Sequence, residues 1–279
     1  MNLYKSLIFI LYLGIFLGSG FRTPAQSRDS ITLYGTLDTV QVIRQRIQHA
    51  NEANAGARVT HISPAILQAN KTRSLAELLT DHTSIYIKSL GTGALSTASF
   101  RGTSASQTRV NWNGINITPP LSGTFDFSQI PVFFTDNINL YYGSSHVKNG
   151  TGAIGGSVNL FTDTDWNRGV NGRVLAEYGS YNTYTVGGQA NISGNKSASK
   201  TRLYYQHSDN DYTYLNKVLT NIPFREKRQD AAYSQFGIMQ EGYFRVSPYT
   251  RLTAVAWYQK NHRNLPQPLG VVNRSQEDQ

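Results

Sequence analysis

The acidic, hydroxyl and imidazole side chains of this 279-residue sequence are not spaced for catalysis. The 6 histidines are scattered, and neither a His-x-x-x-His pair nor a Gly-x-Ser-x-Gly elbow occurs. Asp209-Asn210-Asp211 could begin a calcium loop, but the remaining oxygen ligands of such a loop are missing. We therefore interpret it as a solvated turn. We expect no metal site, no cofactor and no enzymatic activity.

Glycine-rich loops are the other pattern that could carry chemistry. The loop Leu90–Ser96 lacks the Gly-Lys-Ser/Thr ending of a phosphate-binding loop, and no helix is predicted after it. The net charge of +9 is spread along the chain without a basic run, so no nucleic-acid partner is expected. The sequence has 0 cysteines, which excludes disulfides and thiolate metal sites.

Residues 1–25 have the pattern of a signal peptide. Lys5 supplies a basic start, an apolar run follows, and Thr23-Pro24-Ala25 offers a cleavage site. The run is shorter than the roughly 20 residues that a membrane-spanning helix needs. We expect a cleaved export signal.

A lone strand pattern, Asp38–Val42, lies in the polar segment 26–56. Thr39 and Gln41 alternate with Val40 and Val42, and no hairpin partner follows. Two interpretations remain open on this pattern alone. The segment is either the first strand of the next domain or a strand that pairs with another chain through its backbone.

Residues 57–162 predict a compact α+β unit. Ser63-Pro64 starts one helix, and Ser74 with Glu77 forms the capping box of a second. Asn113-Gly114 is a strong hairpin signal. The predicted strands are Ser84–Lys88, Ala98–Gly102, Thr108–Trp112, Asn137–Tyr142 and Ser157–Thr162.

Longer alternating segments follow from Asp163 onward. In residues 181–192, Tyr184, Val186 and Ile192 share one face, and Thr185 and Gln189 share the other. Such segments of about ten residues are typical of transmembrane β-strands, although a soluble β-sandwich also alternates. The predicted strands are Arg173–Tyr178, Tyr181–Ile192, Arg202–Ser208, Tyr233–Val246 and Arg251–Lys260. The aromatic residues expected at strand ends or on the lipid face are Tyr178, Tyr181, Tyr184, Tyr204, Tyr205, Tyr243, Trp257 and Tyr258.

These strands are too few to close a barrel. A barrel must close to satisfy its backbone in lipid, and about five strands fall short of the smallest common barrel of about 8. The last residues, Asn273–Gln279, are polar and are not predicted to form a strand. We therefore expect an N-terminal part of a larger polypeptide.

A series of short motifs runs through residues 99–162. Its members are Ser99-Phe100-Arg101-Gly102, Arg109-Val110, Asn113-Gly114-Ile115, Ile130-Pro131, Asn137-Ile138, Gly143 and Gly150-Thr151-Gly152-Ala153-Ile154-Gly155-Gly156-Ser157-Val158-Asn159-Leu160. Together they resemble the plug domain of TonB-dependent outer-membrane receptors, and most closely the vitamin B12 type.

The resemblance implies a fold and a function. The plug would be residues 57–163, inside a 22-stranded antiparallel transmembrane β-barrel that starts with residues 164–279. The protein would sit in the outer membrane, contact its lipid, and import a scarce cobalamin-like compound or metal chelate with energy from TonB. A ferric-siderophore receptor and a non-transporting outer-membrane adhesin are the alternatives. The lone strand would be the TonB box, formed by Asp38, Thr39, Val40, Gln41 and Val42.

The resemblance also implies roles for individual residues. The substrate-facing plug loops would contain Ser89, Leu90, Gly91, Thr92, Gly93, Ala94, Leu95, Ser96, Pro119, Pro120, Leu121, Ser122 and Gly123. The plug's structural motif would contain Arg101, Gly102, Gly114, Gly143, Gly152, Gly155 and Gly156. We expect an acidic partner for Arg101. Asn139, Tyr142 and Ser144 depart from the family pattern, which predicts the loss of a charged pair between plug and barrel.

Overall fold

The computed structural model describes residues 58–143, 153–217, 223–265 and 275–278. They all belong to one compact unit, which spans Gln45–Gln279. The predicted signal peptide, the segment Asp38–Val42, Ser144 and Gly152 lie outside the described residues.

Both predicted helices form, and their caps follow the sequence signals. Helix α3 (Pro64–Ala69) begins after Ser63, whose hydroxyl accepts a hydrogen bond from the backbone N–H of Ile66. Helix α4 (Leu75–His82) has the full capping box between Ser74 and Glu77. The buried face of α4 packs into the domain core, because its leucines recur at helical spacing.

A five-stranded mixed sheet forms the body of the N-terminal part, which we call the α+β domain (residues 58–143 and 153–163). Its order is β1-β6-β7-β4-β5, with β4 and β7 parallel and the other neighbours antiparallel. The strands are β1 (Arg58–His61), β4 (Thr108–Trp112), β5 (Ile115–Asn116), β6 (Asn137–Tyr142) and β7 (Gly156–Phe161). The Asn113-Gly114 hairpin joins β4 to β5 as predicted, with both residues at positive φ.

One predicted strand, Ala98–Gly102, is wrong in its extent. Strand β3 (Ser96–Ser99) ends before Phe100 and pairs with β2 (Tyr86–Ser89) in a separate two-stranded sheet. Arg101 and Gly102 both have positive φ, and the N–H of Thr103 donates to the carbonyl of Phe100 over 2.9 Å. A tight turn therefore replaces the predicted extension of this strand to Gly102.

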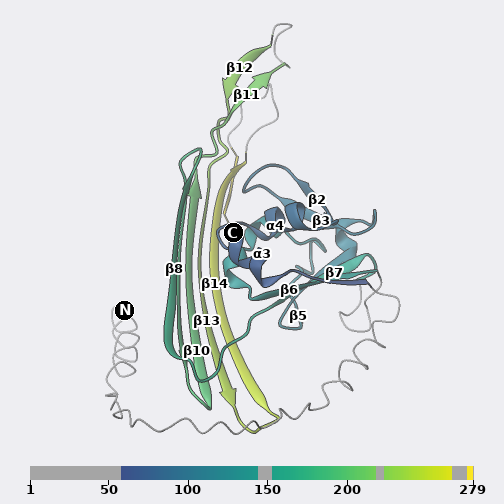
Figure 1. The fold of residues 1–279 in the computed structure, drawn as a ribbon. Helices are drawn as coiled ribbons and strands as arrows, with labels where there is room; N and C mark the ends of the chain where they lie inside the picture. Colours follow the sequence, from purple (N-terminus) through teal and green to yellow (C-terminus); the bar gives the residue numbers. More distant parts are fainter. Residues whose placement is uncertain (1–57, 144–152, 218–222, 266–274, 279) are drawn as a thin grey trace, which may run out of the picture. The chain divides into compact units, whose positions relative to one another are not determined.

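The second part of the chain is a six-stranded antiparallel sheet of mostly long strands, which we call the wall sheet (Figure 1). Its order is β15-β14-β13-β10-β9-β8. The strands are β8 (Gly169–Gly179), β9 (Thr183–Ser193), β10 (Ser197–Ser208), β13 (Tyr233–Arg245), β14 (Arg251–Leu265) and β15 (Ser275–Asp278). Between β10 and β13 a hairpin of β11 (Thr213–Asn216) and β12 (Phe224–Lys227), missed by sequence reasoning, projects past the sheet.

Strand β15 corrects the prediction for the polar end of the chain. Ser275–Asp278 pairs with Leu265–His262 of β14. Backbone groups make this pairing, so it needs no apolar side chains in β15. Alternation along a sequence detects strands with one apolar face, and it missed this short polar one.

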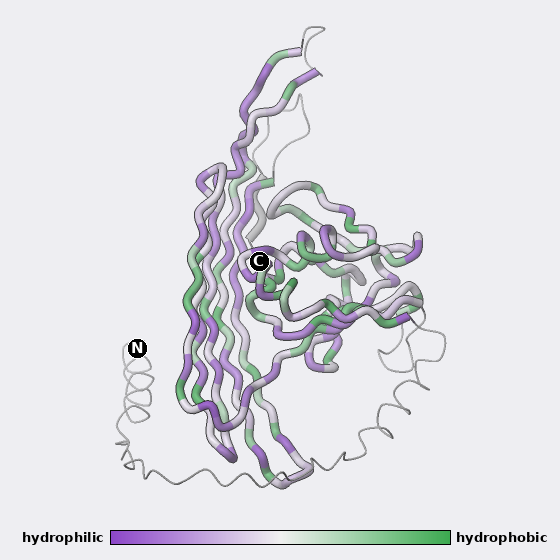
Figure 2. Tube along the Cα trace, viewed as in Figure 1, coloured by the Kyte–Doolittle hydropathy of each residue, from purple (hydrophilic) through white to green (hydrophobic). Residues whose placement is uncertain are grey.

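Exposed and buried residues alternate along β9, β10 and β13, as predicted for strands with two different faces, and Figure 2 shows polar and apolar residues interspersed along the long strands. Val186 and Ile192 of β9 are about half exposed (49% and 50%), whereas Thr185 on the opposite face is 2% exposed. Strand β13 repeats this, with Phe236 exposed and Gln235 buried. No helix among the described residues is long and apolar enough to cross a membrane.

Two aromatic residues, Tyr204 and Trp257, contradict their predicted positions at strand ends or on the lipid face, whereas Tyr243 also faces inward but lies near the end of β13 as predicted. Tyr204 and Tyr243 are buried (2% and 1% exposed), and Trp257 packs 6.1 Å from the ring of Phe134 in the α+β domain. The Tyr204 hydroxyl donates to the Thr72 carbonyl over 2.9 Å. These side chains therefore point from the wall sheet into the α+β domain and not outward. Strand parity explains this for Tyr204, because it shares a face with Arg202 and Gln206.

Candidate ligand pocket and domain contacts

Two loops predicted to face a substrate meet at one pocket of about 520 Å³. Leu90, Ala94 and Leu95 come from the first loop, and Pro119 and Ser122 come from the second. The rest of the pocket is lined by Thr124, Phe125, Asp126, Gln129, Arg228, Arg263 and Leu265. The other predicted loop residues lie outside this lining, and Leu121 is fully exposed. A role in substrate contact remains a prediction for all of them.

The first loop is held against the wall sheet. The amide of Asn210 donates to the Thr92 carbonyl over 3.1 Å. A Cβ on Gly93 would come within 2.5 Å of Cγ of the Tyr233 ring, so only glycine allows the backbone to approach this closely. Thr92 and Gly93 also line a smaller adjoining pocket of about 40 Å³ with Arg228 and Arg263.

Asp126 lines the pocket and also makes an ion pair with the wall sheet. Its carboxylate caps the short 3₁₀ helix Phe127–Gln129 through the N–H of Ser128, and it accepts a hydrogen bond from the N–H of Ser96. Arg263 of β14 donates to the same carboxylate over 2.8 Å. Sequence reasoning missed this pair. An Asx cap at Asp126 was detectable from local sequence, but a partner on a distant strand was not.

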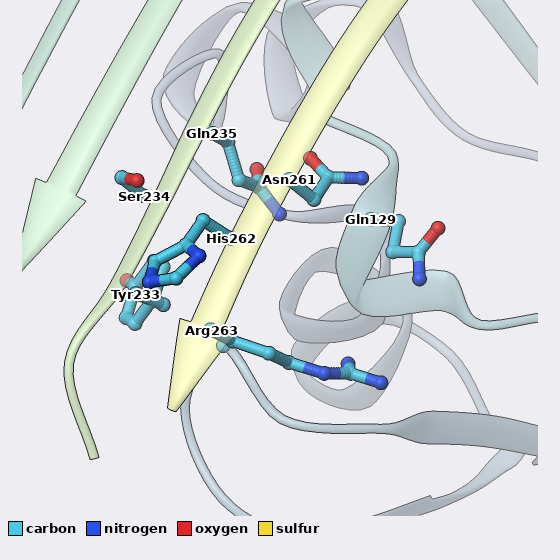
Figure 3. Close-up of a pocket in the computed structure, with 8 residues that line it drawn as sticks. Gln129, Tyr233, Ser234, Gln235, Asn261, His262 and Arg263 are labelled. Atoms are coloured by element: carbon cyan, nitrogen blue, oxygen red, sulfur yellow. The ribbon is translucent and has the colours of Figure 1, made fainter. Parts of the chain in front are cut away.

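Arg263 leaves β14 on the side of the α+β domain. Figure 3 shows it extending towards the segment that carries Gln129, with His262 on the opposite side of the strand. The crevice drawn there is only about 10 Å³, close to the size of one water molecule. Gln235 donates to the Ser128 carbonyl over 2.9 Å beside it. The crevice therefore marks tight packing between the domain and the wall, and the larger pocket is the candidate binding site.

A buried charge cluster forms a second contact between the domain and the wall. Arg202 of β10 is fully buried and donates to Asp136 over 2.5 Å and to the carbonyl of Phe134. Lys200 also reaches Asp136, over 3.0 Å. Glu241 of β13, equally buried, lies 3.6 Å from Arg202. Burial alone would raise the pKa of Asp136, but Arg202 and Lys200 outweigh it and lower that pKa, so the carboxylate is ionised.

Asn139 and Tyr142, two of the residues that depart from the family pattern, make contacts within the α+β domain. Asn139 accepts a hydrogen bond from His61 over 2.6 Å, and Tyr142 packs edge-on against Phe100 with ring centroids 5.2 Å apart. Neither contacts a charged residue of the wall sheet in the described part of the chain. Asp136 with Arg202 supplies a charged connection instead. The loss of the pair expected at the departing positions therefore stays a prediction, and Ser144 lies outside the described residues.

The predicted acidic partner of Arg101 is also absent from the described residues. Arg101 is exposed, has a positive φ in the turn that it shares with Gly102, and makes no ion pair with the described residues. Gly114 and Gly143 likewise occupy turns at positive φ. Gly155 and Gly156 are close-packed instead, and a Cβ on Gly156 would lie 2.5 Å from the Tyr141 carbonyl oxygen.

Because Lys71 is buried, we expect the free energy of unfolding to depend on pH. Its ammonium group is buried and donates to the carbonyls of Val132 and Thr135, and burial lowers its pKa from 10.5 to about 8. Between these two values the unfolded state binds more protons, so stability rises with pH across that window. The full rise is on the order of 3 kcal/mol. Urea unfolding between pH 8 and 10.5 should show this rise in the free energy of unfolding for the native chain and not for Lys71→Met.

The exposed Lys88 of β2 provides a control for this measurement. Lys88→Met should keep the native slope of stability against pH, because Lys88 is exposed and lies on β2, outside the buried contacts of Lys71. Equal slopes for Lys71→Met and the native chain would refute the assignment to Lys71.

Residues 51–157 match the family described as TonB-dependent Receptor Plug Domain. The chain carries a TonB-dependent receptor plug domain. The α+β domain is this plug. Two vitamin B12 transporters named BtuB are 32% identical to the chain, over 135 residues in a Photobacterium profundum protein and over 126 residues in a Vibrio cholerae serotype O1 protein. These alignments cover 48% and 45% of the chain and 22% and 20% of the relatives, so the chain spans about a fifth of their length.

Solved structures of other proteins have the same fold as the plug and the strands that follow it. The pyoverdine outer membrane receptor FpvA from Pseudomonas aeruginosa PAO1 aligns with a TM-score of 0.59 at 15% identity, over 76% of this chain and 28% of that one. The siderophore receptor PiuA from Acinetobacter baumannii aligns with a TM-score of 0.55 at 20% identity, over 74% and 26%. The relatives named here are transporters and receptors. This chain shares with the solved structures a plug domain combined with antiparallel strands.

Proposed function

We propose that this chain belongs to an outer-membrane receptor that imports a scarce, large ligand with energy supplied through TonB. The observation that carries the proposal is the plug itself, attached by polar and charged contacts to an antiparallel sheet. A gate needs attachments that can be broken without unfolding its core, and hydrogen bonds and ion pairs at an interface are of this kind. The pocket between the two plug loops is the place where the ligand binds.

The exposed apolar face of the wall sheet supports a location in the outer membrane. Its outward face carries Val186, Ile192, Phe236 and Ile238, all more than a third exposed. Exposed apolar side chains in such numbers are unfavourable in water but suit the hydrocarbon of a bilayer. The wall sheet would then be part of a transmembrane barrel, with the plug on its inner face.

A cobalamin-like compound is the ligand that the comparisons favour. The vitamin B12 transporters are 32% identical to the chain, whereas the siderophore receptors share the fold at 20% identity or less. A ferric siderophore is the second candidate. Binding of cyanocobalamin and of ferric pyoverdine to the same cells would separate the two.

The TonB box provides the test of energy coupling. Strand addition needs the backbone N–H groups of the added segment, and proline removes one of them. Val40→Pro should therefore reduce uptake of labelled cyanocobalamin to the level of de-energised cells and leave its binding at the cell surface unchanged. Val40→Ala, which keeps the N–H group, should transport normally.

Two outcomes would count against the proposal. Uptake that survives Val40→Pro would show that Asp38–Val42 is not the coupling segment. Binding without any uptake, unaffected by a protonophore, would instead favour a non-transporting surface-binding protein.

A further inference from the structure

The ligand pocket has an ion pair built into its lining. Asp126 and Arg263 are 2.8 Å apart, with side chains only 10% and 11% exposed. We propose that an acidic group of the ligand replaces Asp126 at Arg263 when the ligand binds. This inference rests on the proposed function, because it assumes that the pocket receives the ligand.

The two carboxylate oxygens of Asp126 have different partners. Oδ1 accepts hydrogen bonds from the N–H of Ser96, 2.9 Å away, and from the N–H and hydroxyl of Ser128, 3.0 and 2.7 Å away. Oδ2 accepts from Arg263, and more weakly from Gln129 over 3.4 Å. One oxygen therefore holds the plug together, and the other attaches the plug to β14. Loss of the Arg263 contact alone leaves the three contacts of Oδ1 in place.

The lining indicates the chemical class of the ligand. Arg228 and Arg263 are its two cations and Asp126 its one carboxylate within the described residues. Leu90, Leu95 and Phe125 supply apolar surface. An oxyanion on an apolar body fits this combination, because a guanidinium binds a ligand carboxylate with the same fork geometry it uses for Asp126.

An exchange of partners also has a favourable energy balance. A pair this poorly exposed is costly to break, because an uncompensated charge would remain away from water. A ligand oxyanion restores a partner to Arg263 at the moment Asp126 leaves. The apolar body of the ligand then contributes the net affinity by covering the leucines and the phenylalanine.

The exchange would connect ligand binding to the plug. With Arg263 occupied by the ligand, the 3₁₀ helix after Asp126 loses its ion pair with β14 but stays bonded to the first loop through Ser96. This helix leads directly to Phe133 and Phe134, the segment that Arg202 binds. The plug would therefore be less firmly attached on the ligand side before any pulling force acts.

Two fluorescent probes of nearly the same shape, one charged and one neutral, test whether a ligand carboxylate replaces Asp126 at Arg263. Dansylglycine carries a carboxylate on an aromatic body, and dansylglycinamide is its neutral amide. Their dissociation constants would be measured by fluorescence on the whole protein in detergent. We expect the native protein to bind dansylglycine about tenfold more tightly than the amide. Asp126→Asn should tighten dansylglycine about tenfold further, because the competing charge is removed while the Oδ1 acceptor is kept.

Arg263→Gln should remove the preference for the carboxylate probe. Arg251→Gln is the matched control, since Arg251 lies on the same strand and pairs with Asp163, which is not part of the pocket lining. Its affinities should equal those of the native protein. Unfolding midpoints of all variants identify any that fail to fold, and Asp126→Asn tests the exchange independently of Arg263→Gln.

Equal binding of both probes to the native protein would overturn the inference, as would weaker binding of dansylglycine to Asp126→Asn. Equal losses in Arg263→Gln and Arg251→Gln would also overturn it. These measurements need neither TonB nor an energised membrane. They can therefore fail while uptake through the TonB box is intact, or succeed while uptake is absent.

Discussion

Arg202→Met is expected to destabilise the folded chain by about 3–5 kcal/mol, the typical cost of breaking a buried ion pair from one side. Arg202 is fully buried between plug and wall, where it contacts Asp136, Glu241 and the carbonyl of Phe134. Asp136 keeps Lys200 as a partner in the variant. Glu241, also fully buried, loses the cation 3.6 Å away and keeps the hydrogen bond from the hydroxyl of Tyr243. Urea unfolding followed by tryptophan fluorescence measures the loss.

A second substitution separates lost charge balance from lost packing. Arg202→Met combined with Glu241→Gln removes both charges of that pair, so the double variant should recover a large part of the stability. Arg251→Gln should cost about 1 kcal/mol or less, because Arg251 and Asp163 are 50% and 59% exposed. A double variant no more stable than Arg202→Met would show that the charge of Glu241 is not the cause.

Gly237→Val is expected to displace the plug from the wall sheet and to destabilise the chain by about 1–3 kcal/mol or more. A Cβ at Gly237 of β13 would lie 2.7 Å from the ring of Phe134, well inside van der Waals contact. Phe134 is fully buried and packs against Phe133, Tyr204 and Trp257, so its ring has little room to move. Unfolding and the emission of Trp257, which reports on this contact, provide the measurement.

Gly188 of β9 is a matched control for this steric argument. No atom lies within 4 Å of a Cβ built there, so Gly188→Val should leave the plug contact unchanged. Phe134→Leu combined with Gly237→Ala should recover part of the loss, because the smaller side chain frees the space that the new methyl group needs. Equal effects of the two valine substitutions would mean that strand propensity, and not the ring of Phe134, determines the outcome.

Local sequence determined many, though not all, of the elements of this protein. Ser74 and Glu77 cap α4, and Asn113-Gly114 turns the chain between β4 and β5, because caps and tight turns depend on residues within a few positions of one another. The alternation in β9 and β13 likewise predicted which side chains are exposed. The short motifs of residues 99–162, taken together, identified the plug by their resemblance to the family, and the family match confirms it.

The tertiary structure decided which residues meet across the plug and the wall. Asp136 and Arg202 are 66 positions apart, and Asp126 and Arg263 are 137 positions apart. No local pattern selects such partners, because they depend on which strand lies beside the plug and in which register. The same holds for Tyr204 and Trp257, whose rings pack against the plug, and for Arg101, which stays in solvent. The polar strand β15 forms because its backbone pairs with the edge strand β14. This pairing, too, depends on the folded chain and not on local sequence.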